Sequence, residues 1–256
     1  MPPLNQKDKL CFPFGFGAVL AEQRLFCLPF AGGGASFFLP WRKILTEVAV
    51  IPLQYPGRET RINEGCHDEL SHLVEELAIA LLPHLDRPYT LLGYSLGAKV
   101  GFALCHRLIE LGAPPPRLFI AIAHGAPDAE PFLRGAADLP PESFEQHIKR
   151  YGGMPDVVFQ DAELAKMLLS VLRSDIRLVE HAVPDQPLPC NIVAYAGAED
   201  HAAPPESLEE WRRFSATGFT RRTFAGGHFF ARSASDFLPT LAADLATDLA
   251  TNLAAG

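Results

Sequence analysis

The sequence lacks the features that mark membrane-spanning, nucleic-acid-binding or disulfide-rich proteins. No run approaches the roughly 20 apolar residues that a transmembrane helix needs. Acidic residues outnumber basic ones, and the net charge of -8 argues against a nucleic-acid surface and a basic membrane patch. The five cysteines form an odd set without a Cys-x-x-Cys pair. Cys27, Cys105 and Cys190 lie in or beside apolar patterns, so we expect reduced core residues and no metal site.

The first residues resemble a secretory signal in part. Lys7 and Lys9 precede an apolar run at 10–21, and the end of this run mimics a signal-peptidase site. However, Asp8 separates the two lysines, and the apolar run is interrupted by Pro13, Gly15 and Gly17. We therefore expect a cytoplasmic protein.

The glycine-rich segments do not have the pattern of nucleotide-binding loops. Ala31-Gly32-Gly33-Gly34 is not followed by Gly-Lys-Ser/Thr, which excludes a P-loop. Gly15-Phe16-Gly17 lacks the third glycine and the preceding strand of a dinucleotide site. We accordingly expect no cofactor.

The chain alternates between short apolar runs and amphipathic helical patterns. Its 256 residues predict one domain, 1–256, with a mostly parallel sheet and helices on both faces. The predicted strands are 25–30, 48–53, 89–92, 118–123, 191–196 and 222–225. The predicted helices include 68–85, 96–111, 205–215 and a C-terminal helix from residue 237.

This alternation breaks at 128–189, where helical patterns follow one another without a strand. The patterns run over 142–151 and 162–172, and Gly152-Gly153-Met154-Pro155 separates them. A helical insertion at this place predicts a lid, which would exclude water and supply an apolar wall. The alternative is a rigid helical cap.

The most informative motif is Gly93-Tyr94-Ser95-Leu96-Gly97, which lies between the strand at 89–92 and the helix at 96–111. A G-x-S-x-G in this context is typical of the nucleophile elbow of α/β-hydrolases, where glycines allow a sharp turn that exposes the serine. The motif therefore predicts that Ser95 is a nucleophile. The alternative is a tight turn whose serine caps the next helix.

An elbow of this kind requires an acid and a base later in the chain, each in a loop after a strand. Asp200 follows the strand at 191–196, and His228 follows paired glycines after the strand at 222–225. We predict that His228 is the base and that Asp200 orients it. Glu199 and His201 are the weaker rivals. The other histidines are expected on the surface or in the core: His67, His72, His84, His106, His124, His147 and His181.

The chemistry also requires N–H donors for an oxyanion. The elbow itself places the backbone N–H of Leu96, and the loop after the strand at 25–30 supplies the second donor. We assign this donor to Ala31, with Gly32 as the alternative.

Four separated motifs carry a resemblance to the external (type II) thioesterases of non-ribosomal peptide and polyketide synthases. The resemblance runs from about residue 26 to about residue 241, and its motifs are Leu28–Gly33, Tyr55–Arg61, Gly93–Gly97 and Gly226–Phe230. By position, Ser95 resembles the nucleophile, His228 the base and Asp200 the acid, with Ala31 and Leu96 as oxyanion donors. The chain departs from the family at Tyr94, where most members have histidine, and this difference concerns the shape of the pocket.

The resemblance implies a serine thioesterase that removes aberrant or stalled acyl groups from the phosphopantetheine arm of a carrier protein. We expect the chain to act as a monomer on acyl or peptidyl carrier domains. Because carriers are usually acidic, three basic clusters are candidate contacts, although ordinary solvated faces are the simpler interpretation: Arg42-Lys43, Arg58 with Arg61, and Arg212-Arg213 with Arg221-Arg222. A carboxylesterase with the same triad and a non-catalytic carrier-binding protein are the alternative functions.

Overall fold

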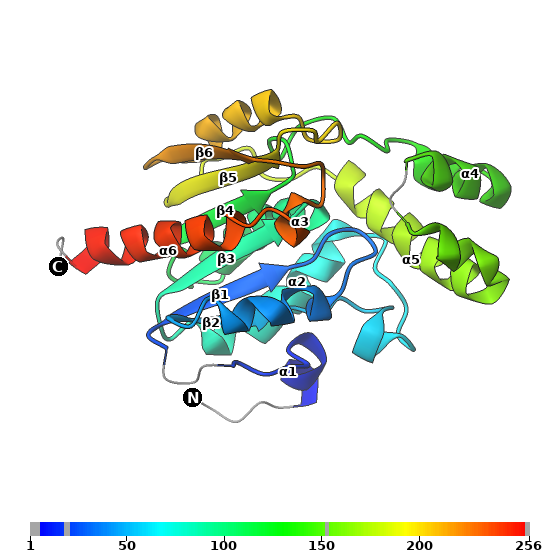
Figure 1. Ribbon diagram of the computed structural model, residues 1–256. Helices are drawn as coiled ribbons and strands as arrows, with labels where there is room; N and C mark the ends of the chain where they lie inside the picture. The colour runs from blue at the N-terminus through cyan, green and yellow to red at the C-terminus, as the bar shows by residue number, and fades with distance from the viewer. Residues whose placement is uncertain (1–5, 18–20, 152–153, 254–256) are drawn as a thin grey trace.

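The computed structural model describes residues 6–17, 21–151 and 154–253. Its six strands form one sheet in the order β2-β1-β3-β4-β5-β6, and each neighbouring pair is parallel (Figure 1). The strands are β1 (Gln23–Leu28), β2 (Val48–Pro52), β3 (Tyr89–Tyr94), β4 (Leu118–Ile122), β5 (Asn191–Gly197) and β6 (Phe219–Phe224). The predicted parallel α/β fold is confirmed, and the carboxyl ends of these strands meet at one edge.

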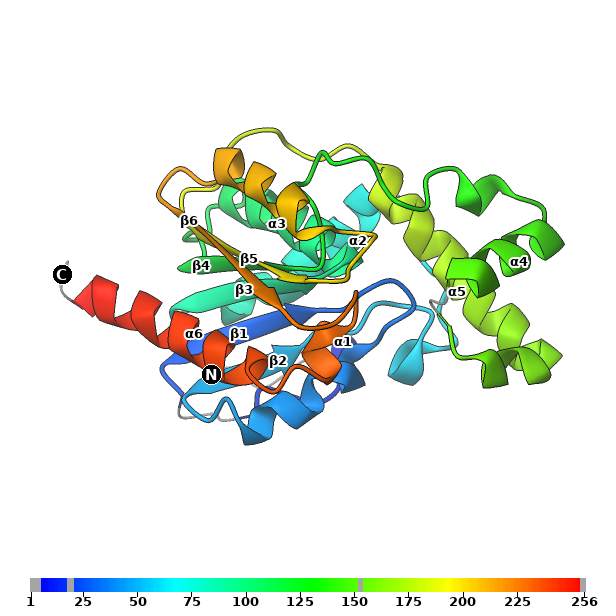
Figure 2. The ribbon, with the colours of Figure 1, turned by 45° about the horizontal axis from the view of Figure 1, so that its top comes forward.

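Helices cover both faces of the sheet, as predicted (Figure 2). One core contains side chains of α2 (Leu70–Leu81), α3 (Leu96–Glu110) and the 3-10 helix η6 (Pro205–Phe214). The opposite core contains side chains of the 3-10 helix η1 (Ala35–Lys43) and of α6 (Phe237–Leu253). Cys27, Cys105 and Cys190 are buried, in agreement with the prediction.

Several boundaries differ from the prediction. The helix expected at 68–85 is shorter, and the 3-10 turn η3 (Leu82–His84) continues it. The segment expected as a helix at 205–215 has 3-10 geometry. The last strand begins at Phe219, earlier than expected, and four of its six side chains are exposed. A polar edge strand of this kind protects a sheet against further pairing, but it hides the strand from an analysis of apolar runs.

The segment between β4 and β5 is helical, and it projects to one side of the sheet (Figure 1). It contains α4 (Pro141–Tyr151), α5 (Ala162–Glu180) and the 3-10 turns η4 (Ala136–Asp138) and η5 (Asp156–Gln160). These elements share a small core of their own, which includes Phe144, Ile148 and Ile176. Helix α5 extends eight residues past the predicted end at Leu172. The predicted break at Gly152-Gly153 lies outside the described residues.

The N-terminal segment packs against the body of the protein. After α1 (Gln6–Cys11), Phe12 and Phe16 are 1% and 4% exposed. Their rings contact Phe26 of β1. Residues 18–20, in the sequence that mimics a cleavage site, lie outside the described residues. None of the helices in the described ranges has the length and apolar character needed to cross a membrane.

The turn from β3 to α3 is closely packed. A Cβ atom on Gly93 would lie 2.1 Å from the carbonyl oxygen of Gly97, and one on Gly97 would lie 2.2 Å from that of Leu28. Both distances are far below van der Waals contact, so only glycine fits at either position. The beginning of α3 is thereby held directly against the ends of β1 and β3.

We predict that Gly93→Ala lowers the free energy of unfolding by about 2 kcal/mol or more, because the added methyl group must displace backbone atoms. Urea denaturation measures the change. Gly65→Ala is the matched control, since a Cβ atom there has no atom within 4 Å, and its effect should stay within about 0.5 kcal/mol. Equal stability of the two variants would contradict the packing described here.

Candidate active site

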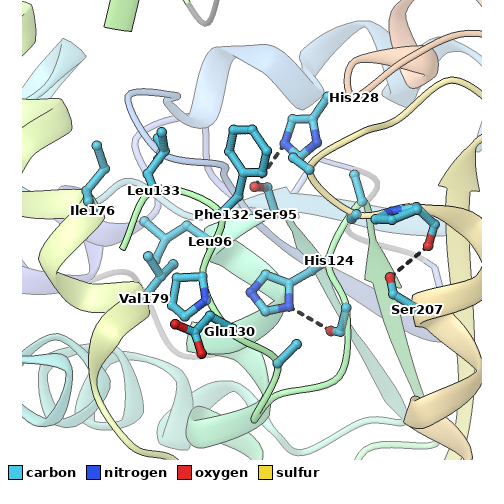
Figure 3. A pocket seen from close by; sticks show the side chains of 18 residues that line it. Ser95, Leu96, His124, Glu130, Phe132, Leu133, Ile176, Val179, Ser207 and His228 are labelled. Atoms are coloured by element: carbon cyan, nitrogen blue, oxygen red, sulfur yellow. Dashed lines mark hydrogen bonds between the residues drawn. The ribbon is translucent and has the colours of Figure 1, made fainter. Parts of the chain in front are cut away.

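Ser95 lies between β3 and α3 in a strained backbone conformation. Its φ of 52° and ψ of -116° are unusual for a residue with a side chain. The Ser95 N–H donates to the carbonyl of Ile122 at 2.7 Å, which ties the turn to the end of β4. The serine side chain is half-buried and lines a cavity (Figure 3).

The structure brings together the three side chains that the sequence predicts as nucleophile, base and acid. The Ser95 hydroxyl lies 3.0 Å from Nε2 of His228, and Nδ1 of His228 lies 2.9 Å from a carboxylate oxygen of Asp200 (Figure 3 shows the first contact). Because an ionised carboxylate only accepts, Nδ1 carries the proton and Nε2 accepts from the serine. The rival residues Glu199 and His201 are both exposed, and neither occupies this chain of contacts.

The Asp200 carboxylate is held firmly. Its side chain is fully buried, and its second oxygen accepts from the N–H groups of Ala202 and Ala203 at 2.9 and 3.1 Å. The loops that carry Asp200 and His228 approach each other closely at Gly197, where a Cβ atom would lie 2.3 Å from the carbonyl oxygen of Gly227. A glycine at the end of β5 is therefore what allows the acid and the imidazole to meet.

Tyr94 has a contact that sequence analysis did not anticipate. Its hydroxyl donates to the backbone carbonyl of His228 at 2.6 Å, and its ring is buried against Phe30, Phe37 and Phe229. The residue before the serine thus holds the loop that carries the histidine. Tyr94 is not among the residues that line the cavity beside Ser95, so in the structure its contact concerns the His228 loop, and the expected effect on the shape of the pocket stays a prediction.

The two predicted oxyanion donors lie on the same cavity as Ser95, which both Ala31 and Leu96 line. Leu96 begins α3, so its N–H belongs to the first turn and has no acceptor within the helix. The N–H of Gly32, the alternative donor, is already bonded to a carboxylate oxygen of Asp175 at 2.7 Å. The alternative is therefore disfavoured.

Asp175 is part of a buried ion pair. Its two oxygens accept from Arg58 at 2.5 and 2.8 Å, and the two side chains are 7% and 1% exposed. The pair connects the loop after β2 to α5, and through Gly32 it also connects both to the loop after β1. The sequence contained no sign of it, because 117 residues separate the two partners.

The interpretation of Arg58 and Arg61 as a solvated face is wrong. Arg58 is 6% exposed and Arg61 is 5% exposed, with Arg61 paired to Glu64 and Glu76. Arg42 is also engaged, since its guanidinium donates to the carbonyls of Phe14, Gly15 and Val50. Of the three predicted basic clusters, the one that contains Arg212 and Arg213 is exposed, and both of these arginines pair with acidic neighbours.

The cavity beside Ser95 has a volume of about 240 Å³ and a largely apolar lining (Figure 3). The helical insertion contributes Phe132, Leu133, Ile176 and Val179 to its wall. Searching the described residues for three or more grouped His, Cys, Asp or Glu side chains finds no candidate metal site. The geometry suits an apolar substrate whose reactive carbon lies beside the serine hydroxyl.

A parallel sheet with a serine, a histidine and an acid aligned at its carboxyl edge is the arrangement of the α/β-hydrolases. The model of one family, described as "Thioesterase domain", matches residues 23–248. The chain therefore belongs to the thioesterase family.

Relatives in biosynthetic pathways agree with this assignment. The gramicidin S biosynthesis protein GrsT of Aneurinibacillus migulanus is 36% identical over 82% of this chain and 83% of GrsT. The solved structure of RedJ, a thioesterase from the prodiginine pathway of Streptomyces coelicolor, has a TM-score of 0.79 and 35% identity over 90% of this chain and 87% of RedJ. The type II thioesterase BorB from the borrelidin cluster has a TM-score of 0.76 and 31% identity over 88% and 92% of the two chains. The resemblance to type II thioesterases is confirmed.

We predict that Tyr94→Phe lowers kcat for thioester hydrolysis about tenfold, because the His228 carbonyl loses a buried hydrogen bond. Steady-state kinetics on an acyl-pantetheine thioester measures the change, and KM should stay within about twofold. Tyr195→Phe is the matched control, since its hydroxyl also makes one buried hydrogen bond, to Asp244. A similar loss of kcat in both variants would show that Tyr94 has no specific role.

We further predict that Asp175→Ala lowers the free energy of unfolding by about 3–5 kcal/mol, since it leaves the Arg58 charge buried and unpaired. In a double-mutant cycle with Arg58→Met, measured by urea denaturation, the double variant should lose less than the sum of the single variants. The exposed pair of Arg134 with Glu130 is the control, where Arg134→Ala should cost less than about 1 kcal/mol. Additive losses at Arg58 and Asp175 would contradict the coupling.

Proposed function

We propose that the chain is a type II thioesterase that hydrolyses acyl groups from the phosphopantetheine arm of carrier proteins and so removes aberrant or stalled intermediates from a synthase. One observation carries this proposal. The imidazole of His228 bridges Ser95 and Asp200 at an apolar cavity of about 240 Å³. The similarity to GrsT, RedJ and BorB supports the assignment to secondary-metabolite biosynthesis.

In the proposed first step, Nε2 of His228 takes the proton of the Ser95 hydroxyl while Oγ attacks the thioester carbonyl. Asp200 keeps Nδ1 protonated and stabilises the imidazolium that forms. The N–H groups of Ala31 and Leu96 receive the oxyanion. The C–S bond then breaks, and the pantetheine sulfur leaves with the proton that His228 holds.

In the second step, His228 takes a proton from water, and the resulting hydroxide attacks the acyl-serine carbonyl. The same two N–H groups stabilise the second oxyanion. The ester bond breaks, the Ser95 oxygen recovers its proton from His228, and the carboxylic acid leaves. The proposed mechanism requires no cofactor in either step, since each proton moves through His228.

We assign residues 128–189 as a lid within a single domain 1–256. The support is that its residues supply the apolar wall of the cavity and that it has its own small core. Such a wall would exclude water from the acyl chain during the reaction. The buried pair of Asp175 with Arg58 anchors this segment at one point beside the oxyanion loop.

We propose that the chain acts as a cytoplasmic monomer. Phe12 and Phe16 are buried against β1, so cleavage of a leader after Ala21 would remove part of the core, which supports retention of this segment.

For docking of the carrier protein, the exposed cluster at Arg212 and Arg213 is the best candidate, since Arg213 pairs with Asp128, which is next to the cavity residue Ala129.

We predict that Ser95→Ala abolishes hydrolysis of acylated carrier protein while the folded state and carrier binding remain. The reason is that Oγ forms the covalent bond in the first step. Thiol release and mass spectrometry of an acylated Ser95 measure the reaction, and calorimetry measures carrier binding. Ser233→Ala is a control at a serine outside the cavity lining.

Matched oxygen esters separate the thioesterase from a carboxylesterase with the same triad. We expect acyl-pantetheine to be hydrolysed with the higher kcat/KM. Full thioester hydrolysis by Ser95→Ala would exclude the mechanism, and a preference for oxygen esters would exclude the proposed substrate class.

A further inference from the structure

His124 lines the cavity, although its sequence context predicted a surface or core histidine. It follows β4 directly, and its ring projects among the cavity-lining side chains (Figure 3). Two contacts fix its backbone. Ala123, with a φ of 51°, donates its N–H to the carbonyl of Tyr195 at 2.8 Å, and the indole N–H of Trp211 donates to the His124 carbonyl at 2.9 Å. The imidazole is thus presented to the cavity by a rigid turn.

The ring has a defined tautomer. Nδ1 lies 2.7 Å from the carbonyl oxygen of Gly125, and a carbonyl only accepts, so Nδ1 carries the proton. In the described part of the chain, the hydrogen bonds of this ring involve Nδ1 alone. Burial lowers the pKa of His124 to about 4, with electrostatic interactions with Lys99 and His228 acting in the same direction and the hydrogen bond to the Gly125 carbonyl opposing it. Near neutral pH the Nε2 atom therefore offers a lone pair to the cavity.

His124 is also close in the fold to the reacting serine. The Ser95 N–H is bonded to the carbonyl of Ile122, two residues before His124. Both side chains line the same cavity. An acyl group that is bound through its carbonyl carbon to Ser95 and lies in this cavity therefore has His124 in its wall, two residues past the backbone position beside Ser95.

We propose that the cavity selects acyl groups that carry a hydroxyl near the thioester, and that this hydroxyl donates a hydrogen bond to Nε2 of His124. The inference rests on the proposed function and names the substrate class of that site. A 3-hydroxyacyl group is the simplest member of this class.

The surroundings favour a hydroxyl over an ammonium group as the donor. Lys99 is 5% exposed, and its ammonium donates to the carbonyl of Val179 at 2.6 Å. Burial lowers the pKa of Lys99 to about 8, so it remains mainly cationic at pH 7 and repels a second cation near His124. The carboxylate of Glu130 also lines the cavity, but its side chain is 70% exposed and pairs with Arg134. A neutral donor therefore fits this position.

The test compares four small pantetheine thioesters on the full chain: butyryl, the two enantiomers of 3-hydroxybutyryl, and 3-aminobutyryl. One hydrogen bond corresponds to a factor of about ten. We expect kcat/KM for the better 3-hydroxybutyryl enantiomer to exceed that for butyryl about tenfold. We expect 3-aminobutyryl to show no such advantage.

Two substitutions separate the two ring nitrogens. His124→Asn keeps an N–H near the position of Nδ1 and removes the acceptor at Nε2, so the hydroxyl preference should fall to about one. His124→Gln places an amide oxygen near the position of Nε2, and it should retain part of the preference. His147→Asn is the control, since His147 is exposed on α4. The measured quantity is the ratio of kcat/KM values within each variant, so a general loss of activity cancels.

An absent hydroxyl preference in the native protein, or the same preference in His124→Asn, would overturn the inference. A His124-dependent preference for 3-aminobutyryl would also overturn it and would assign the position to an ammonium group. If butyryl-pantetheine is cleaved in a Ser95-dependent way without hydroxyl preference, only this inference fails. If none of the four thioesters is cleaved, the proposed function fails with it. Should His124→Asn not fold, the native substrate series and His124→Gln still decide the question.

Discussion

The structure depends on one steric constraint, the close approach of backbone to backbone where β3 turns into α3. Gly93 and Gly97 have no room for a side chain, because carbonyl oxygens of the turn and of β1 occupy that space. This contact fixes the height of Ser95 above the sheet. It also places the first N–H groups of α3 beside the serine hydroxyl, where an oxyanion would form. The predicted nucleophile and one predicted donor therefore come from a single packing requirement, and the strained φ of Ser95 is its local cost.

A second close approach, at Gly197, brings the loops after β5 and β6 together. His228 is then held by three side chains, two from the end of β3 and one from the loop after β5. Asp200 accepts from Nδ1, Ser95 meets Nε2, and Tyr94 fixes the backbone carbonyl. Because parallel strands all end at the same edge, a site of this kind needs only short loops. The order of the strands in the sheet therefore brings residues that are far apart in the sequence, such as Ser95 and His228, next to each other.

The elements that sequence analysis predicted well are those with local signals. Ser95 and Asp200 each follow an apolar strand, and His228 follows paired glycines, so the neighbourhood of each residue could be inferred from a few residues. Contacts between charged residues that lie far apart in the sequence could not be inferred in this way. Arg58 and Asp175 are residue types that usually lie on the surface, and only the fold shows that these two are buried together. The second half of α5 is also rich in charged residues, and for this reason sequence analysis ended the helix too early. His124 was missed for a related reason, since the positive φ that precedes it falls on Ala123, a residue type that gives no sign of a turn in the sequence.

The ion pair also has a consequence for how substrate selection and chemistry are connected. Asp175 holds the N–H of Gly32, which is adjacent to the predicted oxyanion donor Ala31. The next residue of α5, Ile176, lines the acyl cavity. A shift of α5 by a bulky acyl group would thus act on the predicted oxyanion loop through the hydrogen bond between the Gly32 N–H and Asp175. The apolar wall and the donor are therefore not independent parts of the site. An acyl chain that fits the wall poorly would also displace the predicted oxyanion donor Ala31, and discrimination between acyl groups would then be expressed in kcat as well as in KM.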